Sequence, residues 1–280
     1  MDSNTIILIA VLMALAAALY TSVGHAGASG YLAIMALFAV PAATMKPTAL
    51  VLNIIVASIT TFRFVRAGQF NGRLLIPFVV GAIPAAFIAG HLTLPGHYYR
   101  PLVGVILWCA ALRLLWPRAF SNQVESPDDS ENAANQESRA VHRSARIGNR
   151  SSGGETVRQI QPPLWPVSGA IGGGIGFLSG LTGTGGGIFL SPIILFSGWE
   201  AVRKTSGTAA GFILCVSLAG LAGNISSIGH LPTALPWFIG AVLIGTFVGT
   251  RLGLSILPAA RLLQALGLVL IVAGAKLIFT

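Results

Sequence analysis

The chain has 280 residues, of which 54% are hydrophobic and only 9% are charged, and its formal net charge is +9. A soluble domain carries about 25% charged residues, so this composition excludes a protein whose whole surface faces water. A mean hydropathy of +0.79 indicates lipid as the solvent. The basic residues stand at the ends of apolar segments and form no stripe, so no nucleic-acid partner is expected.

Along the chain, the long apolar stretches are the first feature, because a membrane helix needs about 20 apolar residues. None of them shows the two-residue alternation of a β-barrel strand. The first follows Met1 to Asn4, which carry no Lys or Arg, so it is interpreted as a retained helix and not as a secretory signal. The long stretches cover residues 5–23, 48–66, 74–92, 101–117, 164–181, 205–226, 234–252 and 262–279.

Two further apolar stretches, 28–40 and 185–197, are too short to span the membrane. Each directly follows a cluster of glycines, GHAGASG at 24–30 and GLTGTGGG at 180–187. We expect each preceding helix to break inside the membrane at its glycine cluster and to resume as a half-helix.

Residues 118–163 differ in composition from the rest of the chain. They are rich in Ser, Asn, Gln and Arg and hold six of the eight acidic residues, which predicts a loosely ordered polar linker. We therefore divide the chain into a first transmembrane repeat at 1–117, the linker, and a second transmembrane repeat at 164–280. In both halves a long helix, a glycine break and a short helix follow in the same order, which indicates an internal repeat.

The basic residues predict the topology. If each glycine break folds its two helices back on each other, all of the 17 basic residues except Lys46, Arg100 and Lys276 fall on one face. The positive-inside rule then places the linker in the cytoplasm and both termini outside. The expected fold is an all-α polytopic protein of the cell membrane (the inner membrane in bacteria) with eight long helices and two half-helices. The halves are inverted repeats, an arrangement common in secondary transporters.

The positions of the carboxylates indicate the charge of the substrate. No Asp or Glu lies inside an apolar stretch, whereas cation transporters and proton pumps place carboxylates at membrane depth. The N-terminus of a half-helix offers unpaired N–H groups and about half a positive charge. Glycine lets a ligand approach the backbone closely. We therefore expect a small anionic substrate at the glycine breaks.

The candidate substrate-binding residues come from the two breaks and from the helices that follow them. The two lysines stand where the next helix begins in each half, and the hydroxyl groups can donate to an anion. His25 could titrate near neutral pH and so couple transport to a proton. The candidates are His25, Gly27, Ser29, Lys46, Asn53, Thr182, Gly183, Thr184, Gly185, Gly186 and Lys204.

Each candidate also has a structural interpretation, which the sequence leaves open. The lysines could be topology charges, Asn53 could join helices, and His25 could simply be held by hydrogen bonds. We expect no metal and no cofactor, because Cys109 and Cys215 stand alone in apolar runs.

Two regular seams of glycines indicate helix packing. They are Gly172-x-x-x-Gly176-x-x-x-Gly180 and Gly245-x-x-x-Gly249-x-x-x-Gly253.

The stretch from Gly176 to Phe212, GFLSGLTGTGGGIFLSPIILFSGWEAVRKTSGTAAGF, resembles the glycine-rich signature of the sulfite exporter TauE/SafE family. Residues 24–57 resemble the matching repeat, although they have Ala28-Ser29-Gly30 and Lys46-Pro47-Thr48 where the family more often has GGG and V-x-T-S. The resemblance covers most of the chain outside the linker. It implies a permease for small sulfur-containing anions such as sulfite and organosulfonates.

Our preferred function is a carrier that works by alternating access between the two repeats, and not an enzyme. An anion channel could use the same half-helices, and a membrane scaffold would need no broken helices. Gly27-Ala28-Ser29-Gly30 also matches the GxSG string of rhomboid-like proteases. Such an enzyme needs a histidine beside Ser29, whereas His91 and His230 stand at the ends of their segments. The sequence leaves transport direction, coupling ion and homo-oligomeric state open.

Overall fold

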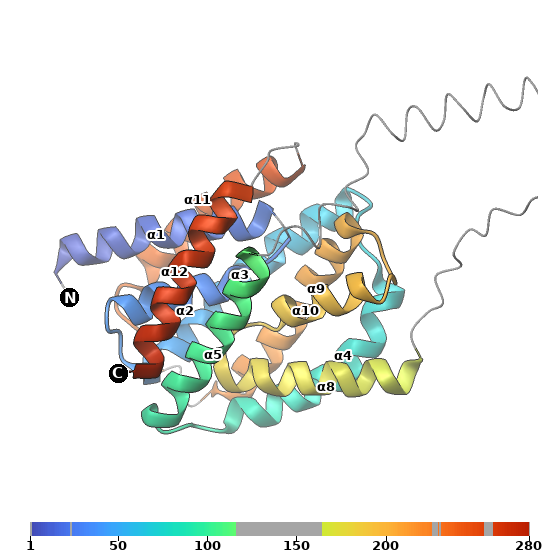
Figure 1. The fold of residues 1–280 in the computed structure, drawn as a ribbon, viewed down its shortest axis with the longest axis horizontal. Helices are drawn as coiled ribbons and strands as arrows, with labels where there is room; N and C mark the ends of the chain where they lie inside the picture. Colours follow the sequence, from blue (N-terminus) through green and yellow to red (C-terminus); the bar gives the residue numbers. More distant parts are fainter. Residues whose placement is uncertain are drawn as a thin grey trace, which may run out of the picture.

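The computed structural model describes residues 2–22, 24–115, 164–225, 229, 231–254 and 260–279. Within those ranges it contains ten α-helices and no strand, so the all-helical prediction is confirmed for them (Figure 1). The polar linker predicted at 118–163 lies outside the described residues. The helices are α1 (Ser3–Ser22), α2 (Ala28–Leu37), α3 (Ala42–Arg66), α4 (Gly72–His91), α5 (Gly96–Leu115), α8 (Trp165–Thr182), α9 (Gly187–Phe196), α10 (Val202–Gly223), α11 (Leu235–Leu254) and α12 (Ala260–Phe279).

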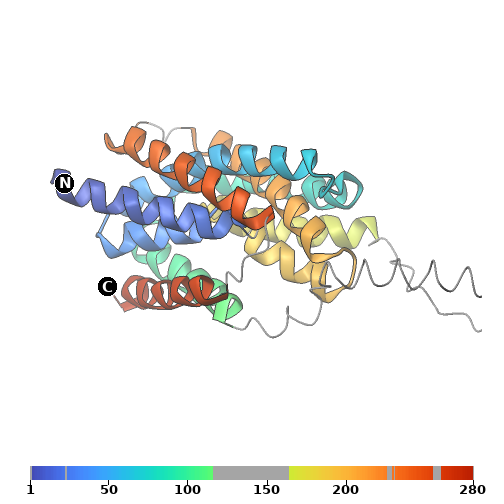
Figure 2. The same cartoon turned by 90° about the horizontal axis from the view of Figure 1, so that it is seen from above.

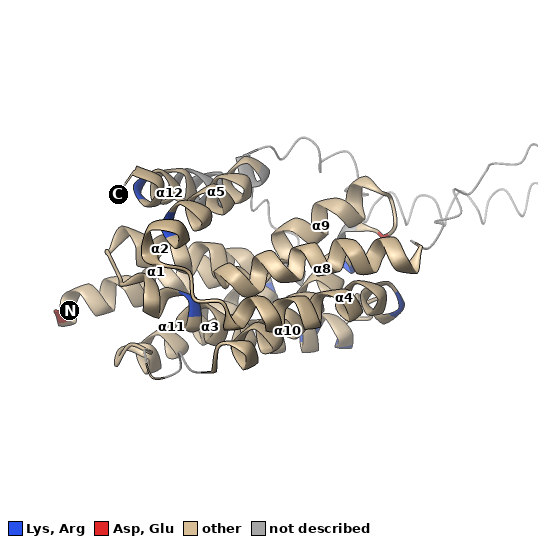
Figure 3. Cartoon of the chain, turned by 90° about the horizontal axis from the view of Figure 1, so that it is seen from below, with Lys and Arg blue, Asp and Glu red and all other residues tan. Residues whose placement is uncertain are grey.

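Each long apolar stretch predicted from the sequence overlaps one of these helices. Among the described residues, four helical segments are long and apolar enough to cross a membrane: α1, α3, α4 and residues 203–223 of α10. Charged residues are sparse along the ribbon (Figure 3), and many large apolar side chains are exposed, among them Ile7, Val80 and Ile244. An exterior of this kind suits a lipid environment.

Helix α3 differs from its prediction in where it begins. The apolar pattern predicts a start at residue 48, but the helix begins six residues earlier, at Ala42, and runs through Pro47. Pro47 is the sixth residue of the helix, so its missing N–H removes the one bond that would reach the Ala43 carbonyl. The earlier start puts Lys46 inside the helix and buries it, at 7% exposure.

Glycine faces allow several helix pairs to touch along their backbones. Gly172, Gly176 and Gly180 of α8 lie against the backbone of α4, and Gly245 and Gly249 lie against that of α1. A side chain at any of these glycines would collide with a carbonyl oxygen of the partner helix. The two seams predicted from the sequence are therefore packing surfaces as far as they are described, since the side-chain surroundings of Gly253 are not.

The contacts between helices also establish their relative directions. Phe78, Ala82 and Ala86 of α4 meet the α8 glycines in ascending order, so α4 and α8 run parallel. Asn53 of α3 meets Ser217 of α10, and Phe64 meets Gly207, so α3 and α10 run antiparallel. The described ends of the chain lie at the same end of the molecule (Figures 1 and 2).

The two short helices fold back as predicted. At one end of the molecule, Lys276 at the end of α12 donates to the Leu37 carbonyl at the end of α2, at 2.7 Å. Helix α9 ends at the opposite end, where Glu200 accepts from Asn71 at the start of α4. The half-helices therefore run in opposite directions, and both begin inside the molecule.

Prediction for the α4–α8 seam: Gly172→Ala lowers the stability of the protein, because the added methyl group meets the backbone of Phe78. Overpacking of this kind costs about 1–3 kcal/mol. The measurement is the unfolding temperature of the purified protein in detergent. The control is Gly174→Ala two residues along, which meets no atom within 4 Å and carries the same change in helix propensity. Equal unfolding temperatures for the two variants would contradict the assigned seam.

Candidate functional site

The two predicted helix breaks are present, and they depend on glycine. Between α1 and α2 the backbone turns at Gly24 and Gly27, with φ of 77° and 91°. Between α8 and α9 it turns at Gly183, Gly185 and Gly186, with φ of 84°, 78° and 73°. Side chains rarely adopt this left-handed region, so the glycines allow the chain to reverse. Helices α2 and α9 have 10 residues each, about 15 Å of length against about 30 Å of hydrocarbon.

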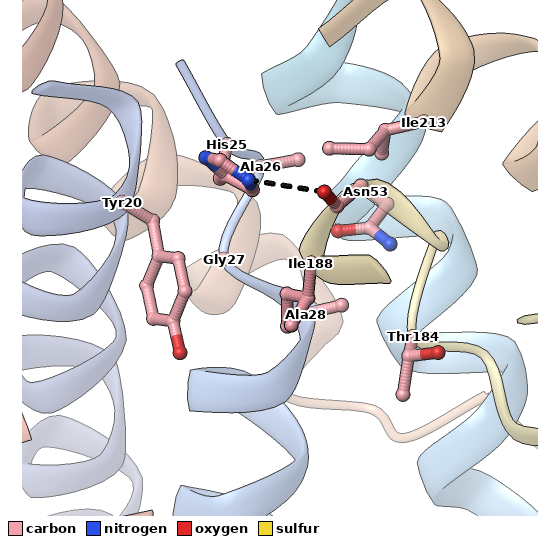
Figure 4. Close-up of a pocket in the computed structure, with 10 residues that line it drawn as sticks. Tyr20, His25, Ala26, Gly27, Ala28, Asn53, Thr184, Ile188 and Ile213 are labelled. Atoms are coloured by element: carbon pink, nitrogen blue, oxygen red, sulfur yellow. Dashed lines mark hydrogen bonds between the residues drawn. The ribbon is translucent and has the colours of Figure 1, made fainter. Parts of the chain in front are cut away.

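A small buried cavity lies between the two breaks (Figure 4). Its volume of about 10 Å³ is at the lower limit for holding one water molecule. Its lining comes from both breaks, from the end of α1, and from α3 and α10. No Asp or Glu is among the lining residues. They are Tyr20, His25, Ala26, Gly27, Ala28, Asn53, Thr184, Gly187, Ile188 and Ile213.

Both half-helices begin at this cavity without a side-chain cap. The N-cap residues are Gly27 for α2 and Gly186 for α9, and neither has a side chain that could accept from the first turn. The first N–H groups of a helix have no partner within the helix, and the aligned peptide dipoles place positive charge there. The cavity is therefore polarised for an electron-rich group.

His25 connects the two breaks. Its side chain is buried at 4% exposure. Its Nε2 atom lies 3.2 Å from the Gly187 carbonyl oxygen and 3.0 Å from Ser191 Oγ. Ser191 in turn donates to the Gly187 carbonyl at 2.9 Å. The imidazole of the first break is thus fixed against the first turn of α9.

Asn53, which lies on α3, contributes its side-chain amide to the wall of the cavity. Its side chain is fully buried, and Nδ2 lies 3.5 Å from the Ser217 hydroxyl of α10. Oδ1 is buried and has no hydrogen-bond partner among the described residues, and leaving such an atom unpaired costs about 1–3 kcal/mol. Because Ser217 can also donate, the amide can turn over, with Oδ1 accepting from Ser217 and Nδ2 open to a ligand.

The remaining polar candidates differ in whether they line the cavity and in their hydrogen-bond partners. Thr184 lines it, and its hydroxyl lies 3.1 Å from that of Thr182. Thr182 does not line it, and its carbonyl accepts from Tyr99 at 2.9 Å. The Ser29 hydroxyl bonds to the Tyr20 hydroxyl at 2.5 Å. This contact is with a phenol, whereas the GxSG protease hypothesis requires a histidine beside Ser29.

The structure places neither candidate lysine in the cavity. The Lys46 ammonium donates to the carbonyls of Ala89, Gly90 and Leu92 at 3.4, 3.0 and 3.2 Å, which neutralises the negative end of the α4 dipole. Lys204 is exposed in the first turn of α10. An apolar pattern locates the start of a helix only to within a few residues, so it cannot tell which polar group an ammonium will find.

Sequence reasoning missed Ser191 and Ser217. Each is a single hydroxyl in an apolar run, and its partner is more than 160 residues away along the chain. The available signal for Ser191 was its place four residues after Gly187, one turn into the half-helix.

Comparison with known proteins agrees with the resemblance of the glycine-rich stretch. The model of the family "Sulfite exporter TauE/SafE" matches residues 8–277. The chain is 36% identical over 262 residues, 93% of each chain, to "Probable membrane transporter protein y4hK" of Sinorhizobium fredii (strain NBRC 101917 / NGR234). No solved structure matches. With a family match over almost its whole length and a helical, apolar fold, this chain belongs to the sulfite exporter TauE/SafE family of membrane transporters.

Proposed function

We propose that this protein is a secondary transporter that carries a small sulfur-containing anion, such as sulfite or an organosulfonate, across the cell membrane. The observation that carries the proposal is the meeting of two uncapped half-helix N-termini at one buried cavity with no carboxylate in its lining. This geometry supports the anion class. Sulfur in the substrate follows from the family description alone.

In this proposal the two halves are inverted repeats, and the contacts of the breaks support it. Gly24 and Gly183 both open a break and have similar φ values, as do Gly27 and Gly186 at the helix starts. Gly24 touches Ser206 in α10, and Gly183 touches Lys46 in α3. Both partners are the fifth residue of their helix. The repeat counterpart of Lys46 is therefore Ser206, and not Lys204.

The proposed substrate site uses backbone and neutral donors. The anion accepts from N–H groups at the starts of α2 and α9, from the Thr184 hydroxyl and from the Asn53 amide. His25 adds a donor or, when protonated, a positive charge beside the anion, which would couple transport to a proton. Such donors are strong in a low-dielectric site because no water competes with them.

The small size of the cavity supports alternating access. With room for at most about one water molecule, the site accepts its substrate only when the two breaks separate. The contacts of His25 with Gly187 and Ser191 cross that boundary, so we propose that they break and re-form as one repeat moves against the other. The linker and the basic helix ends face the cytoplasm in this scheme, and both termini face outward.

Prediction for the substrate site: Thr184→Val raises the KM for sulfite flux in proteoliposomes by about 10- to 100-fold. A hydrogen bond to a charged group contributes about 1.5–3 kcal/mol, and about 1.4 kcal/mol is a factor of ten. Thr60→Val is the matched control, because Thr60 is also buried but donates to its own helix at Val56. An unchanged KM in the Thr184 variant would remove this residue from the site.

Prediction for proton coupling: His25→Gln abolishes substrate accumulation driven by a pH gradient and retains exchange of substrate for substrate. Glutamine keeps a donor for the Gly187 carbonyl but does not titrate. The solute for this assay is an organosulfonate, whose charge stays constant near neutral pH. A variant that still accumulates substrate under the pH gradient would exclude His25 as the proton carrier.

Prediction for carrier against channel: unlabelled substrate inside the vesicle accelerates entry of labelled substrate, because a carrier reorients faster when loaded. The small size of the cavity favours this outcome over a continuous pore. Entry that does not depend on the internal substrate would identify the anion channel instead.

A further inference from the structure

A second candidate site differs in character from the buried cavity. Between the end of α3 and the end of α11 is an open groove of about 770 Å³. Three arginines line it, Arg63, Arg66 and Arg251, together with the rings of Phe62 and Phe247. No Asp or Glu is among its lining residues. The lining of the groove therefore brings three guanidinium groups together.

Two of the three arginines, Arg63 and Arg66, contact neighbouring groups that limit their positions. Arg63 donates to the Thr250 hydroxyl and, at 3.4 Å, to the Phe247 carbonyl. Its guanidinium lies 4.8 Å from the centre of the Phe247 ring, and that of Arg66 lies 5.4 Å from the Phe62 ring. Stacking on aromatic faces fixes the guanidinium planes and leaves N–H donors at their edges.

The groove has an apolar part as well as a cationic part. Phe62 and Phe247 are 59% and 50% exposed, and Ile59 lies one turn of α3 further into the span than Arg63. Arg66 is the last residue of a membrane-spanning helix. We therefore expect its guanidinium at the depth of the lipid headgroups and the rings at the depth of the first acyl carbons.

We propose that this groove binds an anionic phospholipid, with the phosphate held by Arg63, Arg66 and Arg251 and an acyl chain against Phe62 and Phe247. Guanidinium groups bind phosphate through paired hydrogen bonds, and basic sites between transmembrane helices recognise anionic headgroups. A soluble anion would use the arginines but not the exposed rings. Because α3 and α11 come from different halves of the chain, the bound lipid bridges them.

The experiment uses the full-length protein in neutral detergent and counts bound phosphatidylglycerol by native mass spectrometry, with phosphatidylcholine as the neutral lipid. We expect one tightly held phosphatidylglycerol. The double variant Arg66→Gln/Arg251→Gln should weaken its binding at least about tenfold, the effect of losing one charged hydrogen bond. The double variant Arg73→Gln/Arg203→Gln loses the same charge from exposed positions outside the groove and should bind normally.

Three results would overturn the proposal. Equal loss of lipid binding in both double variants would show attraction by net charge alone. Displacement of the lipid by inorganic phosphate at the same concentration would assign the arginines to a soluble anion. Equal binding of phosphatidylcholine would show that the rings, and not the arginines, select the lipid. If the Gln double variant does not fold, Arg66→Gln and Arg251→Gln are measured singly, with Phe62→Ala testing the acyl contact.

Discussion

A backbone that breaks inside a membrane exposes polar groups that hydrocarbon cannot satisfy, and this constraint governs the rest of the structure. Two helices end at Ser22 and Thr182 and resume at Ala28 and Gly187. Such breaks persist only where protein surrounds them or where they face a polar solute. Both conditions shape the interior here, because α3 and α10 enclose the breaks and a small polar cavity remains between them. The cavity is therefore where we place the proposed anion site.

The enclosure depends on helices that approach one another closely. Helices α8 and α11 turn their glycines toward the backbones of α4 and α1, because apolar burial gives little drive for association in lipid and small residues allow backbones to meet. Lys46 and Lys276 tie helix ends together through carbonyl groups. The glycines thus serve two purposes: they allow close packing along α8, and they allow the chain to reverse at the breaks.

Much of this arrangement was predictable from the sequence because its causes are local. Length and apolarity predict the helices, and irregular glycine clusters predict the breaks, since reversal of the chain needs left-handed φ at Gly183, Gly185 and Gly186. The contacts of single polar side chains were not predictable. His25 finds its partners 162 and 166 residues away, and Lys46 points to the end of α4 because α3 begins earlier than its apolar run. Such pairings are set by tertiary packing, which no local pattern encodes.

The uncapped half-helices have a consequence for the valence of the solute. Each helix end contributes about half an elementary charge, so the two together offset about one negative charge. Lys46 is left out of this balance, because its ammonium lies among the carbonyls at the end of α4 and not in the cavity. A divalent ion in the same place would keep an uncompensated charge in a low-dielectric interior, which is costly. At the proposed anion site, electroneutrality therefore favours monovalent species, unless His25 becomes protonated and supplies the second counter-charge.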